Sequence, residues 1–569
     1  MLATAVGLAA LCPPYADCAT RVVDSFPATL YDRQNLACSI SLCMGHSRMV
    51  RTRFAPSPTG YLHIGGVRTA LFCWLFTRRN SGKFLLRIDD TDAAREVEGA
   101  LAPILHGFHW LGMEWDEGPE VGGPHAPYFQ SQRLPSYQAA VAKLLESGLA
   151  YRDYATPAEL DAERKEAEAA KRAYLYSRKW MGDTPEKQRA FEAEGRSGTV
   201  RLKMPREGSL VLEDVVRGRV EFEWAREQDH FVQRADGTCL YHLASVVDDQ
   251  AFGITHVIRS EEHLSNTPRQ VFIAQALGYP LPVYAHLPYV AEPGSKVKLS
   301  KRKLDKYLKN KAFAQVYEHG LKIMAAMGKA PKLEVFNPVV IDFYEQTGYL
   351  PEAILNYLLL VGWSLDDKTE FLTVKEMIEN FSLERVVKGS ASFDPDKLWS
   401  FQGHYMNQLS PEKKIAGMLP YMVEAKLIAE PVSDADRTKL ARAIAAAADR
   451  LKVFGDVLLY ADFFFRADDA FEYDAKDFEK RVKTPGAVER LIKFRERLAG
   501  LAEFEVGPLE QALNGFVESE GIKMGDIIHA LRVSTTGRGV GPGLYDCLAI
   551  LGKTSVLARI DRAVKLAAG

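Results

Sequence analysis

At 569 residues the chain is long enough for several domains of about 150 residues each, and its 47% hydrophobic and 26% charged residues exclude wholesale disorder. The 72 lysines and arginines against 74 acidic residues give a formal net charge of −2. This excludes binding to nucleic acid or to a membrane through overall charge, and leaves binding through a local basic face as the remaining possibility. Its longest apolar runs are too short to cross a bilayer, and its seven cysteines include no CxxC pair, which argues against a disulfide framework and a structural zinc site. We expect a multi-domain intracellular protein.

Residues 1–48 differ from the rest of the chain. They hold four of the seven cysteines but only six charged residues. The apolar stretch at the start lacks the positive residues that precede a signal-peptide core, and three acids against three arginines do not fit a transit peptide. We therefore expect a leader outside the fold, with the working protein beginning at Met49; a targeting or accessory tail is the alternative.

The chain after the leader predicts a strand, a loop, a helix and a second strand. Residues 49–55 alternate weakly and are followed by the breakers of residues 56–60, and apolar residues then recur with helical spacing from Val67 to Leu75. Residues 83–89 form a short apolar strand that ends in acids. This order indicates a βαβ unit of the dinucleotide-binding kind, whose helix N-terminus can bind phosphate, although such a turn is often only a turn.

Residues 129–240 separate this unit from the next. They begin with amphipathic helices and a charged stretch at residues 156–172, and they return to strands at residues 199–204 and 220–224. The charged stretch is typical of a solvated helix face.

A second βαβ unit is predicted beyond residue 240. Residues 240–247 read as an apolar strand closed by two aspartates, and residues 255–259 as another. The Asn-Thr-Pro sequence at 266–268 begins a helix, and residues 283–290 give one more strand. Residues 296–303 then carry five cations in eight positions, which suits a mobile clamp on phosphate oxygens; a solvated surface loop is the alternative.

The rest of the chain predicts helix. Residues 304–337 are lysine-rich with helical spacing, and we expect a surface helical insert there. From residue 410 onward nearly everything reads as helix, and Ser433 and Asp434 can cap a helix whose apolar residues from Leu440 to Leu451 line one face. This region has no strand-rich pattern of a β-barrel.

Four motifs together resemble the signatures of class I aminoacyl-tRNA synthetases. Their residues are most similar to those of bacterial-type glutamyl-tRNA synthetases. They read RTRFAPSPTGYLHIGG at residues 51–66, RIDDTD at 87–92, VIRSEEH at 257–263 and KLSKR at 298–302. The resemblance runs from about Val50 to the C-terminus, apart from residues 304–337. It implies an α/β fold, with a Rossmann-type catalytic domain that carries an inserted acceptor-binding domain and is followed by an all-α C-terminal anticodon-binding region.

The resemblance also implies how the chain is divided. The implied parts are the leader, 1–48; the first half of the Rossmann domain, 49–128; the inserted acceptor-stem-binding domain, 129–240; the second half of the Rossmann domain, 241–290; a signature-loop and stem-contact region, 291–409, with the insert 304–337; and the helical anticodon-binding domain, 410–569. Helices at the C-terminus disfavour glutaminyl enzymes of the non-bacterial type, which carry β-barrels there. Some relatives have a zinc knuckle in the insertion, but residues 129–238 contain no cysteine, so we expect no zinc.

The implied reaction has two steps. The α-carboxylate of glutamate attacks the α-phosphate of ATP and expels pyrophosphate, and the glutamyl group then passes to the terminal ribose of tRNA. The first step needs placement and charge neutralisation more than covalent help. The implied catalytic residues are His63, Lys298 and Lys301, and the implied ATP-binding residues are His63, Gly65, Gly66, Glu262 and Lys301. Magnesium is expected to accompany ATP.

The implied glutamate pocket has to hold two carboxylates and one ammonium group. Its residues are Arg53, Ala55, Ser57, Asp89, Tyr241, Ser245 and Arg259. A guanidinium pairs with a carboxylate in bidentate fashion, and Arg259 is assigned to the side-chain carboxylate and Asp89 to the ammonium. Three residues depart from the family pattern: Asp89 stands in place of Glu, Gly66 in place of the last His of the first signature, and Leu299 in place of Met. Each assignment has a plainer alternative: a structural ion-pair arginine at 259, a core tyrosine at 241 and a loop histidine at 63.

The expected partners are tRNA(Glu), L-glutamate and ATP, with neither DNA nor a membrane, for a cytoplasmic monomer. Contacts with tRNA are expected at Asp92, Arg450 and Lys452. The alternatives are a glutaminyl-tRNA synthetase, a non-discriminating enzyme that also glutamylates tRNA(Gln), a glutamyl transferase acting on a modified tRNA base, and a tRNA-binding protein without catalysis. Intact His63, Arg259 and Lys301 argue against the last.

Overall fold

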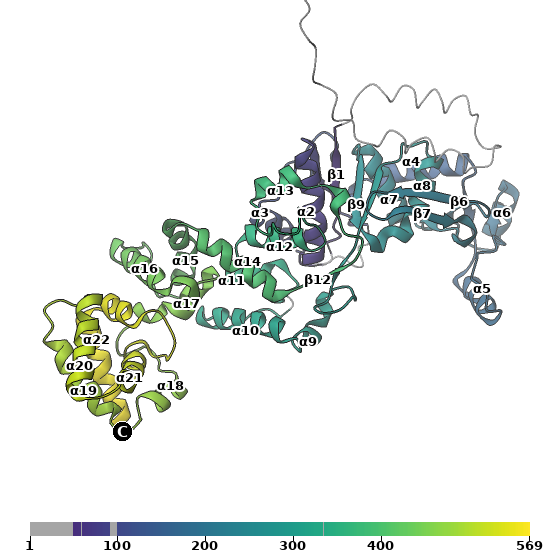
Figure 1. Ribbon diagram of the computed structural model, residues 1–569. Helices are drawn as coiled ribbons and strands as arrows, with labels where there is room; N and C mark the ends of the chain where they lie inside the picture. Colours follow the sequence, from purple (N-terminus) through teal and green to yellow (C-terminus); the bar gives the residue numbers. More distant parts are fainter. Residues whose placement is uncertain (1–48, 59, 92–98, 334, 569) are drawn as a thin grey trace, which may run out of the picture. The chain divides into compact units, whose positions relative to one another are not determined.

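The computed structural model describes residues 49–58, 60–91, 99–333 and 335–568 (Figure 1). The expected leader, residues 1–48, and the expected tRNA contact Asp92 lie outside these residues. The described chain divides into two compact units. The first unit holds the residues up to Leu299 together with Leu358–Phe393, and the second holds Ser300–Tyr357 and the residues from Asp394 onward.

The first expected βαβ unit is confirmed. Strands β1 (Arg51–Phe54) and β2 (Lys83–Leu86) pair in parallel, and helix α2 (Ile64–Arg79) connects them. The helix forms because its apolar residues recur on one face, and Val67 and Leu71 are both fully buried against the strands. This places the loop before α2 at the carboxyl end of β1, which is where α/β sheets bind their ligands.

The second βαβ unit contains strands β9 (His256–Ser260) and β10 (Val283–Leu287), which are also parallel, with α8 (Thr267–Ala276) between them. The two halves are joined through the backbone, because the Thr255 amide donates to the Arg51 carbonyl at 3.0 Å. Segments more than 200 residues apart in sequence therefore lie side by side, at the boundary of the two parallel strand pairs.

The prediction of a strand over residues 240–247 is wrong. These residues begin helix α7 (Tyr241–Ala251), which buries Leu243, Val246 and Val247. A short continuous apolar run carries no period that separates a buried strand from a buried helix, and the run is short enough for either. The correction matters for the site, because a helix brings positions i, i+4, i+7 and i+8 onto one face, here Tyr241, Ser245, Asp248 and Asp249.

The inserted residues form an antiparallel sheet with helices beside it. The sheet order is β4-β3-β5-β8, and a separate hairpin is formed by β6 and β7. The elements are α4 (Leu134–Glu146), β3 (Ala150–Asp153), α5 (Pro157–Ala169), β4 (Met181–Gly182), α6 (Pro185–Ala193), β5 (Thr199–Leu202), β6 (Ser209–Asp214), β7 (Gly218–Glu223) and β8 (Phe231–Gln233). Helix α3 (Leu101–Trp110) precedes the insertion, in the expected first half of the Rossmann domain. The strands expected near residues 199–204 and 220–224 are confirmed as β5 and β7. Helix α5 buries only Leu160 and Ala167, which confirms the solvated helix face.

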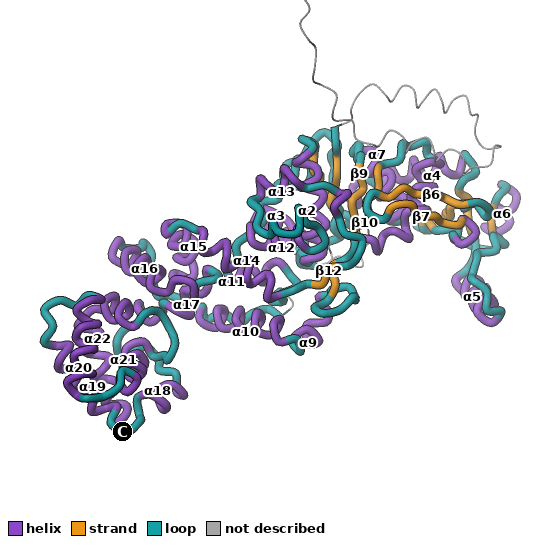
Figure 2. Tube along the Cα trace, in the orientation of Figure 1, coloured by secondary structure: helices purple, strands orange, loops and turns teal. Residues whose placement is uncertain are grey.

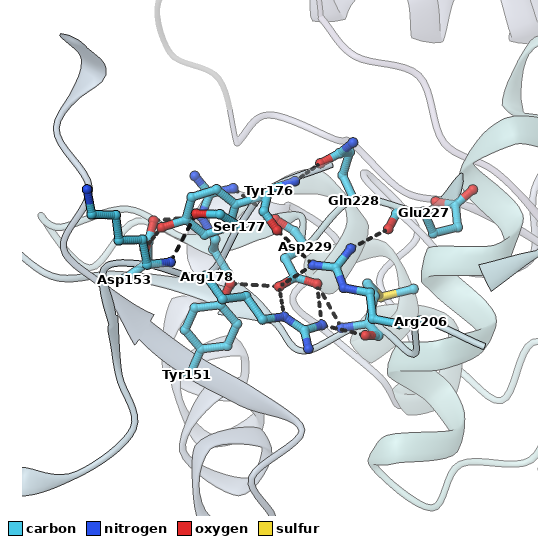
Figure 3. A network of polar contacts seen from close by, with 12 residues as sticks. Tyr151, Asp153, Tyr176, Ser177, Arg178, Arg206, Glu227, Gln228 and Asp229 are labelled. Carbon is cyan, nitrogen blue, oxygen red and sulfur yellow. Dashed lines mark hydrogen bonds and ion pairs between the residues drawn. The ribbon is translucent and has the colours of Figure 1, made fainter. Parts of the chain in front are cut away.

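A buried polar network centred on Asp229 holds the loops of this insertion together (Figure 3). The Asp229 carboxylate, fully buried, accepts from Tyr151 Oη at 2.7 Å, from Arg178 Nε and Nη2 at 2.6 and 2.9 Å, and from the Met204 amide at 3.1 Å. Three separate segments thus share one anion, and a fully hydrogen-bonded buried network of this kind fixes their arrangement.

The described part of the second unit contains helices and loops and no strand (Figure 2). Its helices, with α12 shared between the units, are α9 (Leu304–Tyr307), α10 (Lys311–Ala326), α11 (Ile341–Thr347), α12 (Pro351–Leu360), α14 (Pro395–Gln408), α15 (Pro411–Glu424), α16 (Asp434–Ala447), α17 (Val457–Tyr460), α18 (Ala475–Arg481), α19 (Ala487–Ala499), α20 (Val506–Glu520), α21 (Gly525–Thr536) and α22 (Leu544–Ala568). The first unit also includes α13 (Val374–Asn380) and the short parallel pair β11 (Val290–Ala291) and β12 (Ala391–Ser392). The helical C-terminal region is confirmed.

Two expected helices of this unit can be compared directly. Helix α16 begins as predicted, with the Ser433 hydroxyl accepting from the Asp436 amide at 3.0 Å and with Leu440 and Ile444 buried. Helix α10 lies in the segment expected to be a surface insert; it is amphipathic, and its inner face buries Phe313 and Ile323 completely. None of the helices in the residues that the structure describes is long and apolar enough to cross a membrane.

Gly362 offers a test of how tightly the first unit is packed. It adopts φ +95°, and a Cβ there would lie 2.6 Å from Nη2 of Arg68, which is buried and donates to the Val361 and Pro288 carbonyls. Because left-handed strain adds to displacement of Arg68, Gly362→Ala should lower the free energy of unfolding by about 2–4 kcal/mol in chemical denaturation. Gly278→Ala, at φ +73° in open space, is the control and should cost about 1 kcal/mol. Equal losses would show that the Arg68 contact imposes no constraint.

Candidate functional site

His63 caps the first turn of α2. Its Nδ1 accepts from the Gly65 amide at 2.9 Å, so in the neutral ring Nε2 carries the proton. A Cβ at Gly65 would lie 3.2 Å from that same Nδ1, whereas one at Gly66 meets Phe54 only at an ordinary 3.5 Å. The N-terminus of a helix favours an anion through its N–H groups and its dipole. The ring and the helix end together offer N–H donors that suit a phosphate, and we call them the phosphate-binding element. The role expected for His63 on ATP stays a prediction.

A cluster of buried charges lies beside this element. Asp249 on α7 accepts from Arg53 Nε and Nη2 at 3.0 and 3.2 Å and from Arg87 Nη1 at 2.7 Å. Arg87 binds Asp89 through a second pair of hydrogen bonds, at 2.6 and 3.1 Å. Two expected pocket residues, Arg53 and Asp89, are therefore brought together by two residues that sequence reasoning missed, Arg87 and Asp249. The signal for them was present in the RIDDTD motif and in the paired aspartates at 248 and 249.

The members of the cluster differ in how their charge is balanced. Burial opposes the charge on Arg53, but Asp249 outweighs burial and raises the pKa of Arg53. Burial also raises the pKa of the Asp89 carboxyl to about 6, although Arg87 acts in the opposite direction. The Asp89 carboxylate is thus the member of the cluster whose charge is least secure at neutral pH, and it gains most from a cationic ligand.

Asp248, the neighbour of Asp249, ties the inserted residues to α7. Its fully buried carboxylate accepts from Arg133 Nε at 2.6 Å, Gln130 Nε2 at 3.0 Å and Tyr137 Oη at 2.8 Å. Sequence analysis had assigned no role to these residues. The two adjacent aspartates therefore hold different parts of the first unit around one helix.

Arg259 is also buried, but its surroundings are neutral. Its Nε donates to His286 Nε2 at 3.1 Å, Nη1 to Gln270 Oε1 at 2.6 Å, and Nη2 to Thr267 Oγ1 at 2.9 Å. Among the residues that the structure describes, no carboxylate forms an ion pair with it, and burial lowers its pKa. The structural ion pair considered for a strand-end arginine is therefore not seen within the described chain. A buried cation with neutral partners is a strong attractor for an anion.

The remaining expected residues of the first unit lie as follows. Glu262 and Lys298 form an ion pair with each other at the surface. Tyr241 and Ser245 lie on one face of α7, and the Ser245 hydroxyl accepts from Arg87 Nη2 at 3.5 Å. Ala55 and Ser57 follow β1, partly buried and exposed respectively.

Three expected residues belong to the second unit. Lys301 begins the short helical turn Lys301–Lys303, its carbonyl accepts from the Asn337 side chain at 3.1 Å, and burial lowers the pKa of its ammonium. Arg450 is exposed. Lys452 places its ammonium 5.3 Å from the ring centre of Trp399. In the described ranges of both units, no group of three or more His, Cys, Asp and Glu side chains is arranged to hold a metal ion.

Comparison with known proteins gives matches along almost the whole chain. The family model described as "tRNA synthetases class I (E and Q), catalytic domain" matches residues 49–329 and 328–400. The model described as "Anticodon binding domain" matches residues 414–564. The two catalytic-domain matches meet at residues 328–329 and together cover residues 304–337, the segment expected to be a surface helical insert outside the resemblance.

Individual proteins are similar over the same span. The glutamate–tRNA ligase of Moorella thermoacetica is 41% identical over 516 residues, which cover 91% of this chain and 98% of that protein. The glutamate–tRNA ligase of Roseiflexus castenholzii is 40% identical over 528 residues, covering 91% and 97%. A crystal structure of a glutamate tRNA ligase from Elizabethkingia meningosepticum, in complex with its amino acid, superimposes with a TM-score of 0.77 at 32% identity and covers 91% of this chain and 99% of that one.

The shared position of Asp249 between two arginines predicts a large effect of its removal. Asp249→Asn leaves Arg53 and Arg87 short of one buried counter-charge, and breaking a buried ion pair from one side typically costs about 3–5 kcal/mol of unfolding free energy. Chemical denaturation at neutral pH should show a loss of that size.

The control for this prediction is Asp161→Asn, which removes an exposed ion pair with Arg164 and should change stability by less than about 1 kcal/mol. Similar small losses in both variants would contradict the assignment of Asp249 as the central anion of the cluster.

Proposed function

We propose that this chain, which belongs to the family of class I glutamate–tRNA ligases, joins L-glutamate to tRNA through a glutamyl-adenylate and releases AMP and pyrophosphate. The observation that carries the proposal is identity of about 40% with glutamate–tRNA ligases over almost their full length, catalytic and anticodon-binding regions included. Similarity along the whole length of the relatives distinguishes this activity from that of a protein which shares only the nucleotide-binding half.

The phosphate-binding element supports a role in the first step. An α-carboxylate oxygen of glutamate attacks the α-phosphorus of ATP, and the bond to the pyrophosphate oxygen breaks. In our proposal, the Nε2–H of His63 and the N-terminus of α2, with Gly65 and Gly66, bind the phosphates, while Lys298 and Lys301 neutralise charge on the departing pyrophosphate. Glu262 orients Lys298 through their ion pair. Magnesium would accompany ATP and supply positive charge against the phosphates.

The partners of Arg53 and Arg259 support a choice of which arginine binds the side-chain carboxylate of glutamate. Arg53 already has a bidentate carboxylate partner in Asp249, whereas Arg259 has neutral partners. We therefore assign Arg259 to the side-chain carboxylate of glutamate, where a new ion pair stabilises an otherwise uncompensated charge. We assign Asp89 to the substrate ammonium, because a cation beside it further favours the ionised form of a carboxyl whose pKa burial has raised to about 6. Tyr241 and Ser245, together with Ala55 and Ser57, complete the pocket.

The second step needs tRNA at two places. We propose that residues 129–240 bind the acceptor end and residues 410–569 the anticodon, with Arg450 and Lys452 among the contacts. Unpaired anticodon bases stack on aromatic side chains, and the Trp399–Lys452 pair offers such a surface in the second unit. We further propose that the chain acts as a monomer in the cytoplasm.

The proposed function is tested by ATP–pyrophosphate exchange that depends on glutamate, with tRNA present, followed by aminoacylation of purified tRNA(Glu). Absence of glutamate-dependent exchange in the folded protein would refute it. Aminoacylation of tRNA(Gln) with glutamate in the same assay decides whether the enzyme is discriminating.

Lys301→Ala should slow adenylate formation about 10²–10³-fold in single-turnover kinetics, because it removes one preorganised charge from the leaving pyrophosphate. The affinity for tRNA should stay within about threefold, since many other contacts supply it. Lys309→Ala, an exposed lysine of the same unit, is the control and should leave the rate unchanged. An unaltered activation step in Lys301→Ala would remove this residue from the catalytic set.

Arg259→Gln should narrow the preference for glutamate over glutamine in kcat/KM by about a hundredfold or more, because the buried charge that favours an anionic substrate is lost while hydrogen bonding remains. The measurement is adenylate formation with both amino acids in the presence of tRNA. Arg269→Gln, whose arginine already pairs with Glu227, is the matched control. An equal loss towards both amino acids would assign Arg259 to the shared α-carboxylate, and Arg53 would become the side-chain reader.

A further inference from the structure

His286 lies between Arg259 and a buried aspartate. It is opposite Arg259 in the parallel register of β9 and β10, and its Nε2 accepts from Arg259 Nε at 3.1 Å. On the other side of the ring, Nδ1 is 2.6 Å from Oδ2 of Asp214, the last residue of β6. The side chains of His286 and Asp214 are both 0% exposed. None of the four sequence motifs contains either residue.

The contacts define one protonation state of the ring. An ionised carboxylate only accepts hydrogen bonds, so Nδ1 must carry a proton, and a guanidinium only donates, so Nε2 must present its lone pair. Asp214 and Arg259 independently require the same neutral tautomer, and the Thr267 hydroxyl, whose Oγ1 is 3.0 Å from Nε2, can donate to that lone pair as well. Burial lowers the pKa of His286, with Arg259 and Arg217 acting in the same direction against Asp214, and this favours the neutral ring.

Asp214 is itself held rigidly. Its Oδ1 accepts from the amides of Val216 and Arg217 at 3.0 and 2.8 Å, and its two oxygens accept from the His286 amide at 3.2 and 3.1 Å. Burial opposes its ionisation, but the His286 hydrogen bonds and the backbone N–H of Arg217 prevail and lower the pKa of Asp214. The carboxylate is therefore a fixed anion that does not depend on solvent.

The chain of contacts decides which edge of Arg259 can meet a ligand. A guanidinium has five N–H donors, and the one on Nε is taken by His286. Gln270 takes one donor of Nη1, while Thr267 Oγ1 and the His263 carbonyl accept from Nη2 at 2.9 and 3.4 Å. A substrate carboxylate must then bind at the terminal nitrogens, in the orientation that the four protein acceptors allow.

We propose that Asp214 and His286 are positioning residues, which lock the Nε edge of Arg259 and so direct its terminal nitrogens at the side-chain carboxylate of the amino-acid substrate. This inference rests on the role of Arg259 in the proposed function and extends it to residues that touch no substrate. The aspartate fixes the tautomer of the histidine, and the histidine acceptor fixes the guanidinium. Outer partners that set a ring tautomer in this way commonly control the group in contact with the ligand.

Two substitutions of His286 separate this role from simple packing. In His286→Asn the amide overlays Nδ1, so it can still donate to Asp214 but leaves Arg259 Nε without an acceptor. In His286→Gln the amide oxygen reaches the position of Nε2 and restores that acceptor. His256→Asn, the same change at a partly buried histidine of β9, is the control for altering this sheet.

The experiment measures glutamate-dependent ATP–pyrophosphate exchange with tRNA present, for the wild type and the three variants, alongside thermal unfolding. We expect His286→Asn to raise KM for glutamate about 10-fold to 100-fold, which is the size of one hydrogen bond to a charged group, while KM for ATP stays unchanged. We expect His286→Gln to stay within about fivefold of the wild type, and His256→Asn to leave both KM values unchanged. The preference for glutamate over glutamine should narrow in His286→Asn alone.

Any other result of this experiment contradicts either the positioning role of His286 or the proposed function. If the wild type activates glutamate but His286→Asn keeps the wild-type KM, the proposed function stands and the positioning role is wrong. If His286→Asn and His286→Gln raise KM equally, or lose activity in step with their melting temperature, the histidine only packs, and the positioning role is again wrong. A folded wild-type protein that does not activate glutamate overturns the proposed function, and this inference with it.

Discussion

The catalytic half of this molecule depends on the ionic contacts of two adjacent aspartates on α7. Asp249 holds Arg53 of β1 and Arg87 beyond β2, and Asp248 holds Arg133 of the inserted residues. Charges buried this deeply are tolerated only when each has a partner with good geometry, because desolvation costs several kcal/mol per ion. The pairing therefore sets where β1, β2, α7 and the insertion lie relative to one another.

The charge on Arg259 differs from the paired charges of this cluster. Arg53, Arg87 and Arg133 are balanced by carboxylates, whereas Arg259 is surrounded by His286, Gln270 and Thr267. Of these four arginines only Arg259 lacks a carboxylate partner, and a buried guanidinium without a counter-ion strongly attracts a ligand anion. In our proposal, selectivity for a dicarboxylic amino acid comes from this difference: the three other arginines are paired within the protein, and Arg259 is left to pair with the substrate. In our proposal the phosphates of the nucleotide bind separately, at the histidine-capped end of α2.

The features that could be predicted from the sequence are those that local residue patterns determine. The period of apolar residues identified α2 and the strands beside it, and the helix-capping serine identified the start of α16. Sequence reasoning failed at residues 240–247, where an unbroken apolar run has no period to read. It also missed the Asp214–His286 contact, because the two residues are 72 positions apart and neither belongs to a recognisable motif. Ion pairs between distant segments depend on register and burial, which a single sequence does not display.

The hydrogen bond between the Thr255 amide and the Arg51 carbonyl has a consequence for how the protein is made. A ribosome adds about 5–20 residues per second, and the two partners are 204 positions apart, so roughly 10–40 s pass between their synthesis. During that interval one edge of β1 has no neighbour, and an open strand edge invites pairing with other chains. The nascent chain therefore has to shield this edge, by early collapse onto α2 or by a chaperone, until the second half of the sheet emerges.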